Sequence, residues 1–311
     1  MEDSQKKPVL AVLGPTASGK TVLALELAEQ FGCEIVNCDS RQIYSEMSIG
    51  TAHPTIDEMQ RAPHHLFSLV APDHNFSAAD YAKVATAKIR QIWQRGKVPL
   101  LAGGTGFYYD TLAQGLGPAG NDVQLAEQLR VELQSSGMAA MLERLHSLDA
   151  AASSQIDTNN PRRVLRAIEI IMTSGMVLAD NKRVSPLPEA VFMPIVVTRP
   201  REELHRAISR RVDKMIEAGL ESEVCRLTEK YGRQAAGLNS IGYCEWFEFF
   251  EKKIDRAEVR EAIVIHTRQY AKRQETWFRR RPGPPVYNLA DTGICKTVSK
   301  IVAEFIATFA L

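Results

Sequence analysis

Near its N-terminus the chain reads Gly14-Pro15-Thr16-Ala17-Ser18-Gly19-Lys20-Thr21, which is the G-x-x-x-x-G-K-[ST] pattern of phosphate-binding loops. The apolar residues 9–13 before it predict a buried strand, and residues 22–28 after it predict a helix. Glycines let backbone N–H groups face an anion, and the N-terminus of the helix adds partial positive charge. Lys20 would add a full charge, and the Thr21 hydroxyl would hold Mg²⁺. The pattern therefore predicts a phosphate site. It is compatible with a nucleotide kinase, a GTPase or a diphosphate-using transferase.

Further predicted strands follow the loop in the order of an open α/β fold. Residues 34–38 form a second strand at the spacing of a βαβ unit, and residues 98–102 run into Gly103-Gly104-Thr105-Gly106. Strand patterns return at residues 192–198 and 286–289. The predicted fold class is α/β, a P-loop NTPase-like parallel sheet with flanking helices, whose ligands bind at the carboxyl ends of the strands.

The middle of the chain predicts a helical insertion, because strand patterns vanish between residues 116 and 189. Three helices are expected there, at about residues 125–133, 138–148 and 161–172. The catalytic core would then comprise residues 1–115 and 190–311. It would contain a long basic helix near the C-terminus, from about residue 256 to residue 279.

The composition indicates an ordered protein of a reducing compartment. The 311 residues are 45% hydrophobic and 24% charged, with a net charge of +1, so the chain has no global nucleic-acid signature. The five cysteines form no C-x-x-C pair, which argues against disulfides and structural zinc. The N-terminus lacks the form of a signal or transit peptide, and no apolar run reaches membrane-spanning length. We expect a cytoplasmic monomer without a membrane partner.

Three residues are candidates for catalysis. Asp39 follows the second strand beside the phosphate loop and is the predicted general base, although a turn or N-cap aspartate is an equal alternative on position alone. Thr105 would donate a hydrogen bond to a reacting group. Arg211 lies at the margin of the apolar stripe of a predicted helix and would reach toward a diphosphate, although a solvated charge is the commoner outcome there.

Two clusters of cations predict an RNA-facing surface. Arg162, Arg163 and Arg166 lie within one and a half turns of a predicted helix. The run from Lys272 to Arg281 contains five cations and one anion, interleaved with two aromatic residues. Arginines bind phosphates and aromatic rings stack on unpaired bases. A solvated helix face with two core aromatics would be the alternative.

Six blocks of sequence together resemble the tRNA dimethylallyltransferase family, in that family's order and over nearly the whole chain. The blocks are Gly14–Thr21, Asp39-Ser40-Arg41-Gln42-Ile43-Tyr44, Pro63-His64-His65-Leu66, Gly103-Gly104-Thr105-Gly106-Phe107-Tyr108, Gly242-Tyr243 and Lys272-Arg273-Gln274-Glu275-Thr276-Trp277-Phe278-Arg279. The length is similar to that of the bacterial form.

The resemblance implies an isopentenyltransferase whose loop holds the diphosphate of dimethylallyl diphosphate, with Mg²⁺ shared between that diphosphate and Thr21. The acceptor would be N6 of the adenine just 3′ of the tRNA anticodon, taken out of its stack. Asp39 would accept the N6 proton while the amine attacks C1, with Thr105 near the amine. The loop, Lys20 and Arg211 would stabilise the departing diphosphate.

The resemblance also implies contacts to the anticodon stem-loop. They would come from Asp39, Ser40, Arg41, Gln42, Arg162, Arg163, Arg166, Gly242, Tyr243, Lys272, Arg273, Gln274, Trp277 and Arg279. Two departures from the family pattern affect this set: Cys244 stands where a cation usually follows Gly-Tyr, and Arg162 stands where glutamine is usual.

Other functions remain open from the residues themselves. In a small-molecule P-loop kinase, Lys20 would bind ATP and Asp39 would activate a substrate hydroxyl. An adenylate isopentenyltransferase would accept a free nucleotide and need no RNA-facing surface. A non-enzymatic RNA-binding module would leave the phosphate loop without a purpose.

Overall fold

The computed structural model describes residues 6–116, 122–180, 183–280 and 285–309. The chain folds into two compact units. The first unit comprises Met1–Ala113 and Pro186–Leu311, and the second comprises Gln114–Ser185. The first unit contains the phosphate loop and the sheet.

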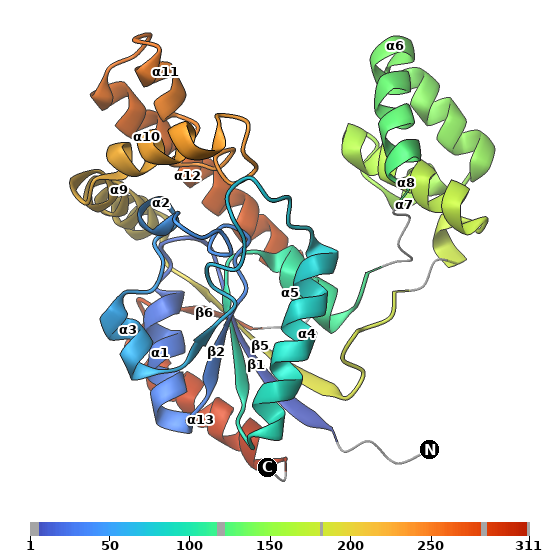
Figure 1. Ribbon diagram of the computed structural model, residues 1–311. Coiled ribbons are helices and arrows are strands. Elements are labelled where there is room, and N and C mark those ends of the chain that lie inside the picture. Colours follow the sequence, from blue (N-terminus) through green and yellow to red (C-terminus); the bar gives the residue numbers. More distant parts are fainter. Residues whose placement is uncertain (1–5, 117–121, 181–182, 281–284, 310–311) are drawn as a thin grey trace. The chain divides into compact units, whose positions relative to one another are not determined.

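The sheet of the first unit has six strands, all parallel, in the order β3-β2-β4-β1-β5-β6 (Figure 1). The strands are β1 (Lys7–Leu13), β2 (Glu34–Asn37), β3 (His64–His65), β4 (Pro99–Gly103), β5 (Ala190–Thr198) and β6 (Val286–Asn288). The parallel α/β sheet predicted from the sequence is confirmed. The two-residue edge strand β3 was not predicted, since a pair of histidines has no strand pattern.

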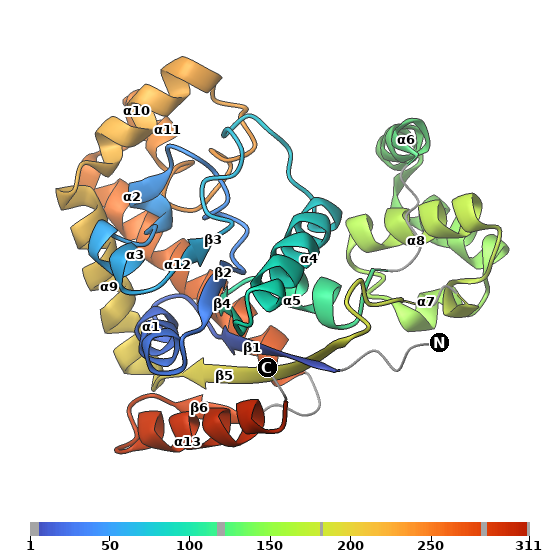
Figure 2. The same cartoon turned by 60° about the horizontal axis from the view of Figure 1, so that its bottom comes forward.

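Helices cover both faces of this sheet because the strands are apolar on both sides. On one face α4 (Ala78–Gln94) and α5 (Gly106–Ala113) pack against Val9 and Ala11 of β1. On the other face α1 (Lys20–Phe31) and α13 (Ile294–Ala307) pack against Leu10 and Val12. Figure 2 shows α13 beside β5 and β6.

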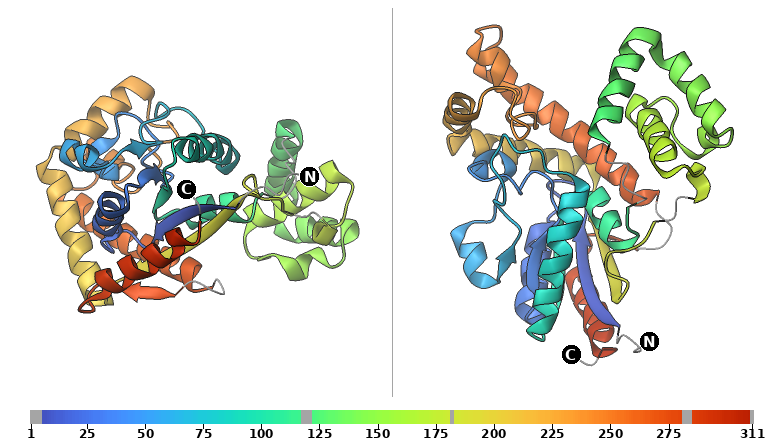
Figure 3. Two further views of the ribbon diagram at one scale, coloured as in Figure 1. Left: turned by 90° about the horizontal axis from the view of Figure 1, so that it is seen from below. Right: turned by 45° about the vertical axis from the view of Figure 1, so that its right-hand side comes forward.

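A group of helices in the same unit follows the carboxyl ends of the strands (Figure 1). It contains α2 (Ser48–Thr51), α3 (Ile56–Arg61), α9 (Arg201–Glu217), α10 (Leu220–Tyr231), α11 (Trp246–Phe250) and α12 (Arg256–Arg279). The right-hand view of Figure 3 shows α12 as one continuous helix. The stripe Leu204, Ile208, Val212 and Met215 is buried along α9.

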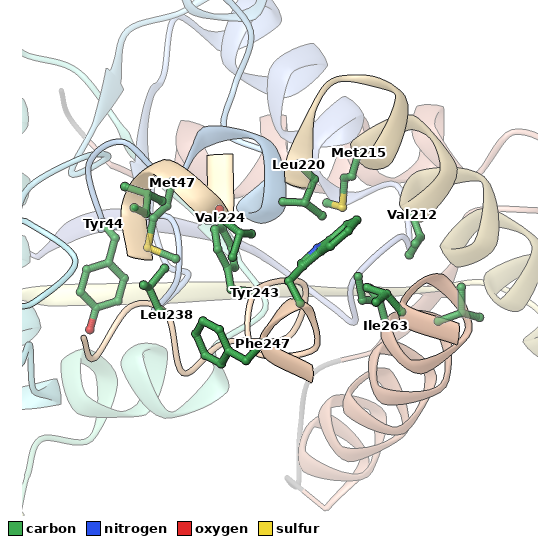
Figure 4. Packing of buried hydrophobic residues seen from close by; sticks show 14 of the residues in the cluster. Tyr44, Met47, Val212, Met215, Leu220, Val224, Leu238, Tyr243, Phe247 and Ile263 are labelled. Carbon is green, nitrogen blue, oxygen red and sulfur yellow. The ribbon is translucent and has the colours of Figure 1, made fainter. Parts of the chain in front are cut away.

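A large apolar cluster joins these helices to the loop that follows β2 (Figure 4). Met47 from that loop packs with Tyr243 and with Val224 of α10. All three side chains are fully buried. This packing fixes the backbone of residues 39–52, which carries several candidate site residues.

The second unit is helical. It contains α6 (Val123–Leu148), α7 (Ala152–Gln155), α8 (Pro161–Ser174) and a short 3₁₀ helix, η1 (Leu178–Asp180). Gly137 interrupts α6 with a φ of 78°, so the chain bends between the two helices that the sequence predicts there. Leu129, Met141 and Ile168 form part of its own core. None of the described helices has the length and apolar character needed to cross a lipid bilayer.

Candidate active site

The phosphate loop connects β1 to α1 and takes backbone conformations that favour glycine. Gly19 has a φ of 95°, and a Cβ on Gly14 would overlap the carbonyl oxygen of Val197. The Nζ of Lys20 donates a hydrogen bond to the Pro15 carbonyl at 3.2 Å. Burial lowers the pKa of Lys20 to about 8; the Asp39 carboxylate opposes this shift and the Arg211 guanidinium adds to it. An anion in the loop would stabilise the charged lysine.

Gln274 of α12 braces this loop from the opposite side. Its Oε1 accepts a hydrogen bond from the Thr16 N–H at 2.9 Å, and its Nε2 donates to the Gly104 carbonyl at 2.8 Å. The side chain is only 5% exposed. The predicted RNA contact of Gln274 is therefore wrong, because its amide is buried between two glycine-rich loops. Arg199 adds a second brace, since its Nε donates to the Ser18 carbonyl at 3.0 Å.

Asp39 lies in a turn built by the last residue of β2. The side chain of Asn37 accepts a hydrogen bond from the Asp39 N–H at 2.8 Å and donates to the Leu66 carbonyl at 3.0 Å. One carboxylate oxygen of Asp39, Oδ1, accepts the Arg41 N–H at 2.9 Å. The other, Oδ2, accepts no hydrogen bond from any residue that the structure describes. The hydrogen bond to Oδ1 thus orients the carboxylate, and Oδ2 is available to accept a proton or hydrogen bond from a ligand.

Thr105 supports this turn. Its hydroxyl oxygen accepts the Ser40 N–H at 2.9 Å, and the hydroxyl donates to the Ser40 Oγ at 3.3 Å. Thr105 does not line either of the two cavities that contain Asp39. In the structure this hydroxyl holds Ser40 beside Asp39, and the predicted hydrogen bond from Thr105 to a reacting group stays a prediction.

Two cavities meet at the Asp39 carboxylate. The loop-side cavity has a volume of about 290 Å³ and contains Lys20 and Thr21 of the phosphate loop. The helix-side cavity has a volume of about 400 Å³ and lies against α9 and α12. Four residues line both cavities: Thr16, Asp39, Thr51 and Arg211. The shared wall therefore combines the carboxylate with a cation.

Arg211 reaches this shared wall from α9, as the sequence predicts for its position. Its Nη2 donates a hydrogen bond to the Thr51 carbonyl at 3.3 Å. Burial lowers the pKa of Arg211, and the negative charge of Asp39 opposes that shift. Its neighbours Arg206 and Arg210 are exposed. Arg211 and Lys20 thus form a buried cationic pair beside one carboxylate.

Aromatic and apolar groups that were not assigned to a site from the sequence complete the two cavities. In the loop-side cavity the Phe67 ring lies 5.9 Å from the His53 ring and 5.6 Å from the His64 ring, measured between centroids. Burial lowers the pKa of both histidines. In the helix-side cavity the apolar groups include Val212, Met215 and Ile263. Both cavities therefore suit ligands with an apolar or aromatic part.

The residues predicted to contact RNA separate into several groups. Arg41, Lys272, Arg273 and Arg279 are exposed, and Gly242 lies on the wall of the helix-side cavity. The Arg273 guanidinium lies 5.7 Å from the ring of Tyr270, a cavity residue that was not predicted. Arg162, Arg163 and Arg166 lie on α8 of the second unit.

Three further predicted RNA contacts are engaged inside the protein. The Tyr243 prediction is wrong, because this side chain is fully buried and its hydroxyl donates to Glu223 at 2.7 Å. Gln42 donates its amide hydrogens to the carbonyls of Thr51 and Ala52, at 3.2 and 2.7 Å. The half-buried ring of Trp277 lies edge-on to Phe107, with centroids 6.3 Å apart.

A third cavity, of about 730 Å³, shares Arg41 and Asn239 with the helix-side cavity. Its walls include Asn75 and the Phe247 ring, over which the Arg233 guanidinium lies at 4.9 Å. Guanidinium groups, amides and aromatic rings together are typical of sites that bind nucleobases. The sequence alone does not indicate this cavity, because its residues come from four separate segments.

The arrangement has the components of a group transfer. A loop that binds anions lies at one end of a pair of cavities, and a carboxylate with an available oxygen lies between them. A phosphate-bearing donor on the loop side and an acceptor on the helix side would meet at Asp39.

Comparisons with known proteins agree with this arrangement. The sequence pattern of the family described as IPP transferase matches residues 42–281. The tRNA dimethylallyltransferase of Shouchella clausii is 38% identical over 304 residues, which cover 97% of this chain and 98% of the relative.

Solved structures give the same result. The crystal structure of a tRNA isopentenylpyrophosphate transferase from Bacillus halodurans matches with a TM-score of 0.73 and 33% identity, covering 98% of each chain. A eukaryotic dimethylallyltransferase acting on tRNA shares the fold, with a TM-score of 0.81 at 24% identity over 98% of this chain and 81% of that one. The chain therefore belongs to the IPP transferase family, and it is a transferase.

Proposed function

We propose that the protein transfers the dimethylallyl group from dimethylallyl diphosphate to N6 of the adenosine 3′-adjacent to the anticodon of tRNA, releasing diphosphate. The observation that carries this proposal is the shared wall of the two cavities, on which Asp39 and Arg211 lie together. The names of the relatives supply the transferred group and tRNA, whereas N6 of the adenosine beside the anticodon is what the resemblance to the family implies.

The loop-side cavity would hold the donor. Backbone N–H groups of the phosphate loop, Lys20 and Arg211 would bind the diphosphate. The dimethylallyl group would lie against Phe67 and the neutral rings of His53 and His64, which line the same cavity. Neutral aromatic faces suit the positive charge that develops on an allylic carbon as its bond to oxygen breaks.

A divalent ion fits this site only together with the substrate. The described residues include no group of three His, Cys, Asp or Glu that would hold a metal by themselves. Thr21 lies at the N-terminus of α1 and lines the loop-side cavity, where its hydroxyl is a suitable oxygen ligand for Mg²⁺. When bound between Thr21 and the diphosphate, Mg²⁺ would neutralise part of the diphosphate charge.

The helix-side cavity would receive the adenine after it leaves the anticodon stack. Asp39 Oδ2 would accept the proton from N6 while N6 forms its bond to C1 of the dimethylallyl group. The C1–O bond breaks and its electron pair leaves with the diphosphate. Lys20 and Arg211 would stabilise that negative charge. The Arg41 N–H keeps the carboxylate in position through Oδ1.

The anticodon stem-loop would contact the exposed cations near the helix-side cavity. Arg41 and Arg273 lie at its rim, and Lys272 and Arg279 are exposed on α12. The third cavity is the proposed place for unpaired nucleotides beside the target base, since it adjoins the helix-side cavity through Arg41 and Asn239. On α8 of the second unit, Arg162, Arg163 and Arg166 would bind phosphates.

The test is a reaction with Mg²⁺, dimethylallyl diphosphate and unmodified tRNA, followed by digestion and mass spectrometry. We expect a dimethylallyl group on the adenosine next to the anticodon. The same reaction with free adenosine monophosphate tests for a nucleotide acceptor. Consumption of ATP with a small acceptor, and no modified adenosine, would overturn the proposal.

A further inference from the structure

The short helix α2 is capped by a residue from a distant helix. Met47 precedes it and offers no side-chain cap, so the first N–H groups need acceptors elsewhere. Ser48, Ile49 and Gly50 all donate these N–H groups to the carboxylate of Glu223, at distances between 3.0 and 3.2 Å. Glu223 lies in the first turn of α10.

The carboxylate of Glu223 is buried and fully engaged. It is 6% exposed and receives two further hydrogen bonds, from the Ser48 hydroxyl at 3.3 Å and from the Tyr243 hydroxyl at 2.7 Å. A buried carboxylate is costly unless hydrogen bonds replace its water. All five donors are neutral, and four of them belong to α2, so the carboxylate keeps these hydrogen bonds only while α2 keeps its position.

The contacts of Glu223 and Tyr243 with α2 form a clamp, and this clamp holds one wall of the active site. Gly50 and Thr51 line the helix-side cavity, and the Thr51 carbonyl accepts the hydrogen bond from Arg211. The backbone of Gly50 lies so close to the Tyr243 ring that a Cβ there would overlap the ring. Glu223 therefore fixes the start of α2, and Tyr243 fixes its height above the core.

We propose that Glu223 and Tyr243 are positioning residues for the transfer reaction, which set the direction of Arg211 through the Thr51 carbonyl. This inference rests on the proposed function, in which Arg211 stabilises the departing diphosphate. Displacement of α2 would move the acceptor of the Arg211 hydrogen bond, and the guanidinium would no longer be held toward the phosphate loop. The chemical step would slow, while RNA binding at exposed cations would remain.

Glu46 offers a matched control. It also ties the segment before α2 to α10, since its carboxylate accepts hydrogen bonds from Arg226 and Lys230 at 2.8 Å and from Tyr231 at 2.6 Å. Its contacts lie at the surface and do not include the N–H groups of α2. If the variants merely loosened this segment, Glu46 and Glu223 variants would lose activity alike. If loss of the clamp is the cause, only the Glu223 variant should lose activity.

The test compares kcat, KM and melting temperature for Glu223→Gln, Tyr243→Phe and Glu46→Gln, with dimethylallyl diphosphate and tRNA as substrates. We expect Glu223→Gln to lower kcat about tenfold to a hundredfold, because the new amide turns a donor toward the α2 donors. Tyr243→Phe should lower kcat about threefold to tenfold. Both should leave the KM for tRNA unchanged, and Glu46→Gln should keep the wild-type kcat.

A double-mutant cycle distinguishes positioning from a merely structural role. If Glu223 acts through Arg211, adding Glu223→Gln to Arg211→Lys should lower kcat little beyond Arg211→Lys alone. Additive losses, equal losses in Glu46→Gln, or wild-type kcat in both clamp variants would overturn the inference. If Glu223→Gln shows no melting transition and so does not fold, the same double-mutant cycle with Tyr243→Phe in its place tests the inference. An inactive wild-type enzyme would instead refute the proposed function.

Discussion

The buried Lys20 makes donor binding depend on pH in a way that can be calculated. Its pKa is lowered from 10.5 to about 8 in the free protein, chiefly by burial. A bound diphosphate places negative charge beside the ammonium and favours the charged form, so the pKa of Lys20 should return toward 10.5. Binding then takes up a proton between these two values, and affinity falls as pH rises through 8.

The magnitude follows from the two pKa values. At pH 7 about nine in ten free Lys20 side chains are charged, and at pH 9 about one in eleven is. In the complex nearly all stay charged at both pH values. The dissociation constant for dimethylallyl diphosphate should therefore rise about tenfold from pH 7 to pH 9, with uptake of about 0.9 proton per site at pH 9.

Isothermal titration calorimetry measures both quantities, with Mg²⁺ present and with buffers of different ionisation enthalpy. Lys20→Arg is the matched control, because arginine stays charged across this range and should remove most of the pH dependence. Equal affinity at pH 7 and pH 9, or binding without proton uptake, would refute the reasoning that burial lowers the Lys20 pKa and that the diphosphate restores it.

Three further predictions follow from the site. Asp39→Ala should lower kcat about a hundredfold or more and leave tRNA affinity in a filter-binding assay nearly unchanged, because the general base is lost without a phosphate contact. Arg273→Ala should weaken tRNA binding and reduce the slope of log affinity against log salt by about one, whereas Gln274→Ala should weaken donor binding and leave that slope unchanged. Gly103→Ala should lower the melting temperature and activity together, because a Cβ there would overlap the Cys38 carbonyl just before Asp39; a fully active, equally stable variant would contradict this packing.

Local patterns in the sequence predicted the parts of the site that depend on neighbouring residues. The phosphate loop, the strand before Asp39 and the buried stripe beside Arg211 each follow from spacing within one segment. The capping box of Ser77 and Asp80 at the start of α4 depends in the same way on residues three positions apart. Short-range geometry is enough to place these residues, because each depends on one turn or one helix face.

Residues whose role depends on distant partners could not be placed in this way. Gln274 reaches Thr16 across 258 positions of the sequence, and Glu223 reaches Ser48 across 175. In the sequence Gln274 stands within a run of cations, so it was assigned to RNA with its neighbours. Neighbouring residues of a helix point in different directions, so Arg273 is exposed while Gln274 is buried. Assigning a whole block of sequence to the surface is therefore wrong for those of its residues that face the core.

The geometry also favours the transferase over the kinase that the phosphate loop alone allows. The loop-side cavity, about 290 Å³, lies just below the range of about 300–1,000 Å³ for ligand sites. It suits a diphosphate with five carbons better than a nucleoside triphosphate. The larger cavities lie on the other side of Asp39, where an acceptor base and its neighbours would bind.

Helix α12 connects the surface proposed for tRNA to the phosphate loop. Consecutive residues of this helix serve the two sides, since Arg273 lines the helix-side cavity while Gln274 holds Thr16 and Gly104. A shift of the helix on contact with RNA would therefore move the amide that supports the phosphate loop. The loop cannot keep its shape independently of α12, because the Thr16 N–H would lose its acceptor. The basic helix is thus part of the donor site as well as of the surface proposed for tRNA.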